Sequence, residues 1–367
     1  MSLAILGIGT ALPSTVLTCA DSLAINTRLS GETADRASWL PGIYAGTGIR
    51  KRHTAIGAGA VRDILHGTRD SGSPFLPDLV GSNGPSTGDR MRLYAELAPP
   101  LAEAAARHAL RRSHKPAGAV THLVTVSCTG FRAPGVDVSL IRSLGLAPTV
   151  QRTHIGFMGC HGALNGLRVA RAFANDGADT CVLLCAVELC TLHIHYGSDP
   201  QRLVANALFG DGAAAAVGVP GGGAAADAWR VVGAGSCLVP DSATAMTWAI
   251  SDHGFAMTLS KSVPRLIATH IRPWLTEWLR GHNLTPGDVA SWAIHPGGPR
   301  ILEAAAEGIG LPDQALAASR EVLVDCGNMS SPTLLFILER LRAAGAPLPC
   351  LALGFGPGLM AEAVLFR

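Results

Sequence analysis

The residues of this 367-residue chain best suited to chemistry are a cysteine, a histidine and an asparagine, each set among glycines. Cys160 is followed by apolar residues at helical spacing, which predicts that it lies at or beside a helix N-terminus, where the helix dipole favours a thiolate. His295 and Asn328 are each predicted to follow a strand directly, where glycines let the backbone approach a substrate closely. Because a cysteine nucleophile needs a proton acceptor and a group that orients the acyl group, the three together predict nucleophilic acyl transfer.

The elements that must position these residues alternate between short apolar runs and Ala-rich helical stretches, as is typical of an α/β protein with strands buried on both faces. The clearest predicted strands are Ala119–Val126, Thr180–Val187, Ala213–Val219, Ser291–Ile294, Glu321–Val324 and Ala361–Phe366. The clearest predicted helices are Met91–Leu110, Gly162–Ala174, Pro264–Arg280 and Pro332–Ala344. His66–Gly88 is predicted to be a long surface loop, and Val219–Ala226 a linker near the middle of the chain.

Two pairs of similar segments occur in the same order on either side of that linker. Leu6–Pro13 resembles Val232–Pro240, and Phe209–Gly212 resembles Phe355–Gly358. Coincidence among Gly-rich turns is the alternative, but each pair occupies an equivalent place in its part of the chain. The pattern therefore favours a duplicated α/β unit.

Other motifs favour structural roles. His193–His195 has no surrounding acidic or cysteine ligand set, so no metal site is predicted. The Gly7–Gly9 turn lacks the rest of a dinucleotide fingerprint, so no NAD site is predicted. Glu188 ends a very apolar run and is predicted to be a hydrogen-bonded buried carboxylate rather than an acid catalyst. For His161, beside the nucleophile, two alternatives stay open: tuning of the cysteine pKa, or a ring that points away.

Composition excludes several function classes. Lys+Arg 29 against Asp+Glu 27 gives a formal net charge of +2, so nucleic acid and an anionic membrane are not predicted as partners. No apolar run approaches the ~18–20 residues that span a bilayer, and the first residues lack a charged signal-peptide region, so a cytoplasmic protein without membrane insertion is expected. Its nine cysteines are then expected to stay reduced.

Taken with these motifs, the chain resembles the type III polyketide synthases, the chalcone-synthase-like branch of the thiolase superfamily, over nearly its whole length. The motifs that carry the resemblance are Gly159-Cys160, Ala207–Gly212, Ile294–Pro299, Gly327–Ser331 and Gly354–Gly358. The resemblance implies an α/β, thiolase-like duplicated αβαβα five-layer fold. It places the nucleophilic cysteine in a half formed by residues 1–220 and the catalytic histidine and asparagine in a half formed by residues 221–367.

The same resemblance implies the activity. Cys160 is then the nucleophile onto which the acyl group of a CoA starter is loaded, and His295 and Asn328 complete the catalytic triad. Malonyl-CoA then extends the chain by decarboxylative condensation, and a pyrone or a phenolic, resorcinol-type product is released. An imidazolium form of His295 is expected to assist the thiolate, and both partners are expected to donate to the enolate oxygen. CoA thioesters are substrates, no cofactor is permanently bound, and the enzyme is a homodimer.

The resemblance also implies a substrate cavity, whose gating and lining residues are Phe209, Cys128, Cys190, His193, Trp248, Met257, Ser330 and Pro357. Phe209 matches the phenylalanine that gates the passage to the cavity, and Pro357 a proline that closes one wall. Cys128, Cys190 and His193 stand at threonine positions. Trp248 replaces a glycine and Met257 a second gating phenylalanine.

Two further positions differ from the family in ways that bear on assembly and chain length. Ala133 replaces a methionine that reaches into the partner subunit's cavity. Trp248 and His193 are expected to narrow the cavity and favour early termination, giving a tri- or tetraketide pyrone from a compact starter.

Contacts to CoA are expected from a basic cluster, Arg50, Lys51 and Arg52, which matches a segment near the CoA entrance. The lysine-rich helix that normally precedes it is replaced by Trp39–Tyr44, so Arg300 beside the His295 loop is a further candidate. Two alternatives to the proposed enzyme remain at this point. One is a 3-ketoacyl-ACP synthase III-like condensing enzyme, and the other is a catalytically inactive scaffold with a thiolase fold.

Overall fold

The computed structural model describes residues 2–30, 37–76, 83–224 and 228–367. Its strands are β1 Leu3–Ala11, β2 Thr15–Thr18, β3 Lys51–Thr54, β4 His122–Ser127, β5 Gln151–Gly156, β6 Val182–Leu189, β7 Asp211–Pro220, β8 Arg230–Leu238, β9 Met246–Ser251, β10 Gly254–Leu259, β11 Ser291–Ile294, β12 Cys350–Gly356 and β13 Met360–Phe366. Its helices are α1 Cys19–Leu29, α2 Leu40–Gly46, α3 Ala58–His66, α4 Thr87–Ser113, α5 Val136–Leu144, α6 Gly162–Phe173, α7 Pro200–Leu208, α8 Val263–Arg280, α9 Pro299–Ile309, α10 Ala317–Cys326 and α11 Pro332–Ala343.

Within the described residues, the main sheet has nine strands in the order β11-β12-β13-β8-β1-β7-β6-β4-β5. The same pairing occurs twice: β4 runs parallel to β6, which is antiparallel to β7, and β7 is antiparallel to β1. In the second series β11 is parallel to β12, which is antiparallel to β13, and β13 is antiparallel to β8. The two series meet where β1 and β8 pair antiparallel, with Leu3 opposite Val231. The boundary between residues 220 and 221 remains a prediction.

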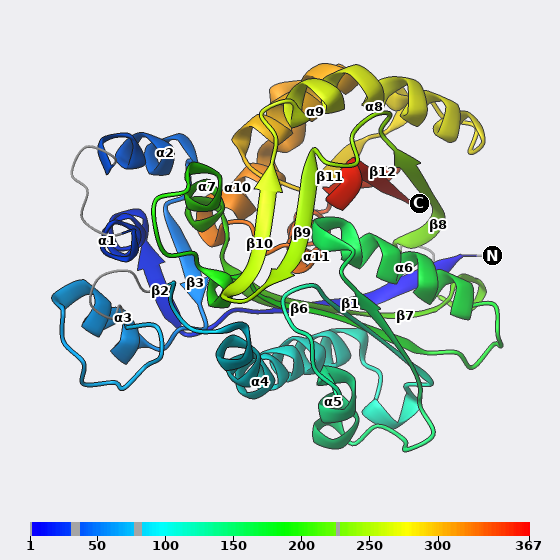
Figure 1. The fold of residues 1–367 in the computed structure, drawn as a ribbon. Coiled ribbons are helices and arrows are strands. Elements are labelled where there is room, and N and C mark those ends of the chain that lie inside the picture. The colour runs from blue at the N-terminus through cyan, green and yellow to red at the C-terminus, as the bar shows by residue number, and fades with distance from the viewer. Residues whose placement is uncertain (1, 31–36, 77–82, 225–227) are drawn as a thin grey trace.

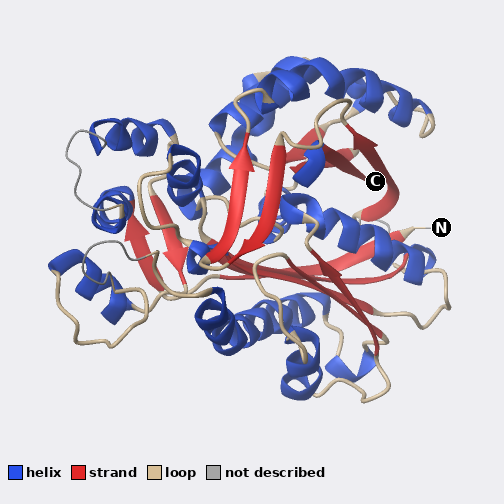
Figure 2. Cartoon of the chain, viewed as in Figure 1, coloured by secondary structure: helices blue, strands red, loops and turns tan. Residues whose placement is uncertain are grey.

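Helices form three layers around these two series of strands (Figures 1 and 2). Helices α6 and α11 lie between the two series, α4 and α5 cover the outer face of the first, and α8 and α9 cover the outer face of the second. Strand residues alternate between these layers: Leu183 faces the α4 side and Leu184 the middle layer. Likewise Leu351 faces the α8 and α9 side and Ala352 the middle layer. The αβαβα five-layer fold is thus confirmed.

Five of the six predicted strands and all four predicted helices are confirmed, apart from shifts at their ends. The prediction for Glu321–Val324 is wrong, because these residues lie inside α10. The apolar run looks like a strand, but Ser319, Val322, Leu323 and Cys326 are buried at helical spacing, and this face packs onto the core. Asn328 therefore follows a helix rather than a strand.

The two predicted connecting segments are shorter than expected. Helix α3 continues to His66, and α4 begins at Thr87 with Ser86 as its N-cap, so the loop between them is bounded by helices. Strand β7 extends to Pro220, two residues into the predicted linker. Residues 77–82 of the loop and 225–226 of the linker lie outside the described residues.

No helix in the described part of the chain combines the length and the apolar character that crossing a bilayer requires.

Close packing of β1 against α4 gives a test of the fold. A Cβ atom at Gly9 would lie 2.3 Å from the Ala109 backbone nitrogen and 2.4 Å from the Ala105 carbonyl oxygen. Because these atoms belong to a buried helix backbone that cannot move aside, Gly9→Ala should destabilise the protein by roughly 1–3 kcal/mol or more. Urea unfolding measures the loss. Gly42→Ala, on α2 with no atom within 4 Å of its Cβ, is the matched control. Equal unfolding midpoints for the two variants would contradict this packing.

Candidate active site

Cys160 lies in the short 3-10 turn Gly159–His161 that leads directly into α6, as the sequence predicts. Gly159 has a φ of 73°, and a Cβ there would lie 2.4 Å from the Pro357 ring. Glycine is therefore required, because it permits the left-handed turn and lets the loop between β12 and β13 close over the cysteine.

Asn328 is held by backbone hydrogen bonds to the segment that carries Phe209. The Asn328 amide donates to the Leu208 carbonyl at 2.9 Å, and the Gly210 amide donates to the Asn328 carbonyl at 3.0 Å. The Asn328 side chain reaches the nucleophile: its Oδ1 lies 3.9 Å and its Nδ2 4.0 Å from the Cys160 sulfur. Since the Ser330 amide donates to Oδ1 at 2.8 Å, Nδ2 remains as the donor that faces the sulfur.

His295 directly follows β11, as predicted, and is 1% exposed. Its backbone amide donates to the Leu353 carbonyl at 2.8 Å, which fixes the residue at the end of the sheet. The Asn328 side chain acts on the ring, but neither ring nitrogen makes a close hydrogen bond among the described residues. An unpaired polar group at this depth costs free energy, so the ring is available to a substrate.

Burial sets the charge of the two reacting side chains. It raises the pKa of the Cys160 thiol to about 11, although hydrogen bonds to Ser330 and Asn328 oppose the rise. It also lowers the pKa of His295 to about 3, with the neighbouring His161 as the second cause. Burial thus favours the neutral thiol and the neutral imidazole, and opposes the imidazolium and the dipole-stabilised thiolate that the sequence predicts. The dipole of a helix end, typically 0.3–1 kcal/mol, is too weak to offset this desolvation.

The structure resolves the two alternatives for His161. The ring is buried, and its Nδ1 lies 2.8 Å from the Asn165 side-chain oxygen, so it is anchored to the first turn of α6. Its electrostatic effect reaches His295 rather than the cysteine beside it in sequence.

Glu188 is the buried, hydrogen-bonded carboxylate that the sequence predicts. It is 0% exposed at the end of β6. It accepts from the Cys128 amide at 2.9 Å, the Thr129 amide at 3.0 Å and the Ser331 hydroxyl at 2.5 Å. Burial raises its pKa, and these donors oppose the rise. The carboxylate thereby joins the loop after β4 to the segment after Asn328.

The predicted cavity exists around Cys160, and we call it the catalytic cavity. The predicted residues that line it are Cys128, Cys190, Phe209, Trp248, Met257, Ser330 and Pro357. Sequence reasoning missed Thr129, Met246 and Thr247, which also line it. Period-2 alternation on the β9–β10 hairpin could have drawn attention to Met246, which shares a strand face with Trp248.

Trp248 is fixed in the wall of the catalytic cavity. It stands opposite Met257 in the β9–β10 hairpin, and its indole Nε1 donates to the Cys128 carbonyl at 2.7 Å. Because the indole is both paired and packed edge-on against Phe255, it occupies the cavity without an unsatisfied polar atom.

His193 does not line the catalytic cavity and faces an adjoining one, which we call the inner cavity. The ring stacks on Phe255 with centroids 4.1 Å apart, and Nδ1 accepts from the Phe255 amide at 3.1 Å. Nε2 therefore carries the proton and donates to the Thr129 carbonyl at 2.7 Å. Burial lowers the pKa of His193 to about 3, so this wall residue is neutral.

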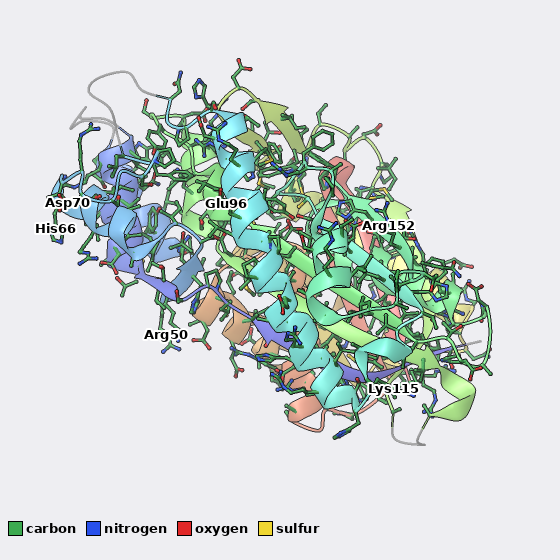
Figure 3. The ribbon with its side chains drawn as sticks, turned by 90° about the horizontal axis from the view of Figure 1, so that it is seen from below. Arg50, His66, Asp70, Glu96, Lys115 and Arg152 are labelled. Carbon is green, nitrogen blue, oxygen red and sulfur yellow. The ribbon has the colours of Figure 1, made fainter. Side chains whose placement is uncertain are left out.

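The four cationic candidates for CoA lie in different environments. Arg50 projects from the edge of the molecule (Figure 3) and pairs with Asp325 at 3.1 Å. Lys51 and Arg300 are exposed. Arg52 is only 2% exposed and donates from Nη1 to the Phe209 and Asn206 carbonyls, both at 3.1 Å, so its assignment to CoA phosphates at the entrance is wrong. Alternation along β3 turns Arg52 inward while its neighbour Lys51 faces solvent.

Among the described residues, no group of three or more His, Cys, Asp or Glu side chains is arranged to hold a metal ion.

Comparisons with known proteins agree on one family. Residues 2–221 match the N-terminal domain of chalcone and stilbene synthases, and residues 230–367 match the C-terminal domain. The chain is 35% identical over 285 residues to the alpha-pyrone synthesis polyketide synthase-like Pks18 of Mycobacterium tuberculosis, covering 76% of this chain and 72% of that protein. It is 33% identical over 339 residues to the 1,3,6,8-tetrahydroxynaphthalene synthase of Streptomyces peucetius, covering 91% and 84%.

A solved structure supports the same relationship. The crystal structure of PKS-I from the brown alga Ectocarpus siliculosus superposes with a TM-score of 0.92 at 32% identity, covering 100% of this chain and 98% of that one.

The neutral state of the thiol gives a pH test. Because burial raises the pKa of Cys160 to about 11, its reactive thiolate fraction should grow with pH. Carbamidomethylation of Cys160 by iodoacetamide, followed by mass spectrometry, should therefore accelerate continuously from pH 7 to pH 10, with Cys160→Ala as the blank. A rate that has already reached a plateau below pH 7 would mean that a thiolate–imidazolium pair dominates instead.

Proposed function

This chain belongs to the chalcone and stilbene synthase family of type III polyketide synthases, malonyl-CoA-dependent acyltransferases, and from that premise we propose how it works. An acyl-CoA starter loads on Cys160, and malonyl-CoA units extend it by decarboxylative condensation. One observation carries the proposal: the Cys160 sulfur, in the wall of an apolar cavity, lies 4.0 Å from the Asn328 Nδ2, and the buried His295 ring interacts with the same Asn328 side chain.

Loading begins from the neutral pair. His295 takes the thiol proton as the Cys160 sulfur attacks the carbonyl carbon of the acyl-CoA thioester. Collapse of the tetrahedral intermediate breaks the bond to the CoA sulfur, and His295 returns the proton to that leaving group. The starter is then held as a thioester on Cys160.

Extension uses His295 and Asn328 as hydrogen-bond donors. Malonyl-CoA loses carbon dioxide, and the electron pair of the broken carbon–carbon bond forms an enolate. An N–H of His295 and the Asn328 Nδ2 donate to the enolate oxygen; loss of one such donor typically costs about 2.7–4 kcal/mol of barrier. The enolate carbon attacks the Cys160 thioester, and the released cysteine sulfur recovers a proton, leaving a β-ketoacyl-CoA.

Phe209 supports both steps by limiting the access of water to the acyl-enzyme. Its side chain lines the catalytic and the inner cavity, between the two spaces. An apolar ring at this position would exclude water that would otherwise hydrolyse the acyl-enzyme.

We infer that the products are short pyrones. Trp248 fills space where related enzymes have a glycine, and its hydrogen bond to Cys128 holds it there. A chain of two or three extensions would then close on itself before it could grow further. The name of the mycobacterial relative, an alpha-pyrone synthesis polyketide synthase-like protein, agrees with this product class.

We also propose a homodimer of subunits, each with halves 1–220 and 221–367. Strand β5 is the free edge of the main sheet, and its Arg152 lies at the surface (Figure 3). Nearby, Phe131 is 69% and Met158 43% exposed, and the loop with Ala133 is also exposed. Exposed apolar side chains beside a sheet edge are suited to pairing with a second copy.

The function is tested by incubating the protein with malonyl-CoA and a panel of acetyl, medium-chain, long-chain and aromatic acyl-CoA starters, with products identified by mass. We expect a polyketide from wild type and none from Cys160→Ala, together with a mass increase on Cys160 from the starter. A starter-dependent polyketide from Cys160→Ala would remove this residue from the role. An intact protein that no CoA thioester acylates would favour the inactive scaffold.

Trp248→Gly should lengthen the product or admit bulkier starters, because it removes an indole that covers up to about 150–250 Å² of surface. Acylation of Cys160 should persist. Trp248→Phe is the matched control, since it loses the hydrogen bond to Cys128 but keeps most of the volume, and its products should match wild type. Product masses across the starter panel measure the effect, and an unchanged profile for Trp248→Gly would show that the indole does not limit elongation.

A further inference from the structure

The inner cavity continues the catalytic cavity away from Cys160. Cys190, Phe209 and Trp248 line both spaces and form the wall between them. The inner cavity has a volume of about 50 Å³, on a scale on which one water molecule occupies about 10–15 Å³. Its size suits a few methylene groups or a small polar terminus, and a chain bound to Cys160 that passes Phe209 would enter it.

One wall of the inner cavity carries a buried cation without an anion. Arg52 lines the space and is 2% exposed. Its Nη1 donates to two carbonyls, but Nε and Nη2 have no hydrogen-bond partner among the described residues. The ionisable groups that act on it are Tyr44 and Cys19, and neither is a carboxylate. Leaving a guanidinium buried in this way is costly, so the site is incomplete without an acceptor.

A further donor on α1 is unpaired. Ser22, which lines the inner cavity, has a buried hydroxyl without a partner among the described residues. Its neighbour on the helix, Asn26, is occupied: its Oδ1 accepts from the Asn206 side chain at 2.9 Å, and its side chain interacts with the Tyr44 hydroxyl. Arg52 and Ser22 therefore present unpaired donors in the lining of the same space.

The described residues that line the inner cavity include no Asp or Glu, and the buried carboxylate of Asp211 lies behind the wall, where it accepts from the Thr191 hydroxyl at 2.5 Å. A second buried guanidinium, Arg90, lies 5.5 Å from the ring of Phe75, another lining residue. Burial, and after it Arg202 and Arg90, lower the pKa of His195 in the same wall to about 4, so this residue is neutral. Arg52 is thus the charged side chain of the described lining, and it favours an anion there.

We propose that the inner cavity binds a carboxylate at the far end of the starter acyl chain, against Arg52 and Ser22, so that the enzyme accepts ω-carboxyacyl-CoA starters. The inference rests on the proposed function, since Cys160 must hold the other end of the chain. The apolar walls fit the methylene groups, and the adjacent Nε and Nη2 of Arg52 present the fork that binds a carboxylate with two hydrogen bonds. A methyl terminus would leave these donors unpaired.

The first test compares starters matched in chain length. Glutaryl-, adipoyl- and suberoyl-CoA are each compared with pentanoyl-, hexanoyl- and octanoyl-CoA, with malonyl-CoA as extender. At the length that reaches Arg52, kcat/KM should be at least about tenfold higher for the ω-carboxy starter, the effect of one charge-assisted hydrogen bond. Equal or better use of the methyl-ended starter at every length would overturn the inference while leaving the proposed function intact.

A second test measures binding in the absence of turnover. Free suberate and free octanoate are titrated into Cys160→Ala by calorimetry, which separates a site for the carboxylate itself from one that needs the CoA thioester. Binding of free suberate together with a preference for ω-carboxy starters supports a site for the carboxylate itself, and the preference without suberate binding supports a site that needs the CoA thioester. Without a starter preference the inference fails, and binding of a free carboxylate is then adventitious only. Absence of any polyketide from every starter would instead count against the proposed function.

Ser22→Asp supplies the missing anion from the protein. It should reduce the preference for the ω-carboxy starter at least about tenfold, because its carboxylate occupies Arg52. Thr27→Asp, on the exposed face of the same helix, adds the same charge outside the cavity and should keep the wild-type preference. Arg52→Gln is a poorer probe, since it also releases the Phe209 carbonyl. An unchanged preference in a folded Ser22→Asp protein would overturn the assignment.

Discussion

The buried carboxylate of Glu188 is the interaction on which the geometry of the catalytic cavity depends. It comes from β6, yet it accepts hydrogen bonds from the loop after β4 and from Ser331, which follows Asn328 in the other half of the chain. A carboxylate that is 0% exposed must satisfy its lone pairs, so these segments cannot separate without a large cost in free energy. The wall residue Cys128 and the segment of Asn328 are thereby fixed relative to each other, although they lie 200 residues apart in sequence.

The low polarity that fixes this geometry also determines the starting point of the chemistry. A site wet enough to stabilise a thiolate would also admit water to the acyl-enzyme. In the dry site, burial favours neutral forms of Cys160 and His295, so in the proposed mechanism the charge develops as the reaction proceeds. Donors that are already oriented then act on that charge at full strength, because no solvent has to reorganise. Arg52 is the exception, since it keeps its charge in the same dry interior and pairs with no anion in the part of the chain that the structure describes.

Five of the six strands and all four helices that local sequence pattern predicted are present, because hydrophobic periodicity reports burial directly. It failed at Glu321–Val324, where β-branched residues suggest a strand but the buried positions follow helical spacing. The proximity of Cys160 and Asn328 and most residues of the catalytic cavity could be predicted because their motifs resemble a known family, whereas the catalytic roles stay predictions. Three properties depend on the assembled core. They are the inward direction of Arg52, the position of His193 in the inner rather than the catalytic cavity, and the protonation states of Cys160 and His295. These properties come from contacts between distant segments, which a local pattern does not contain.

The backbone around Phe209 indicates how this residue can act as a gate. Arg52 donates to the Phe209 carbonyl, and Asn328 pairs with both neighbours, Leu208 and Gly210. With three consecutive residues held by buried hydrogen bonds, movement of the loop would break several of them at once, at about 1 kcal/mol or more each. Rotation of the aromatic side chain breaks none. If Phe209 is the proposed gate, rotation of its side chain is therefore the easier way to open the wall that it forms with Cys190 and Trp248, while the backbone paired with Asn328 stays in place.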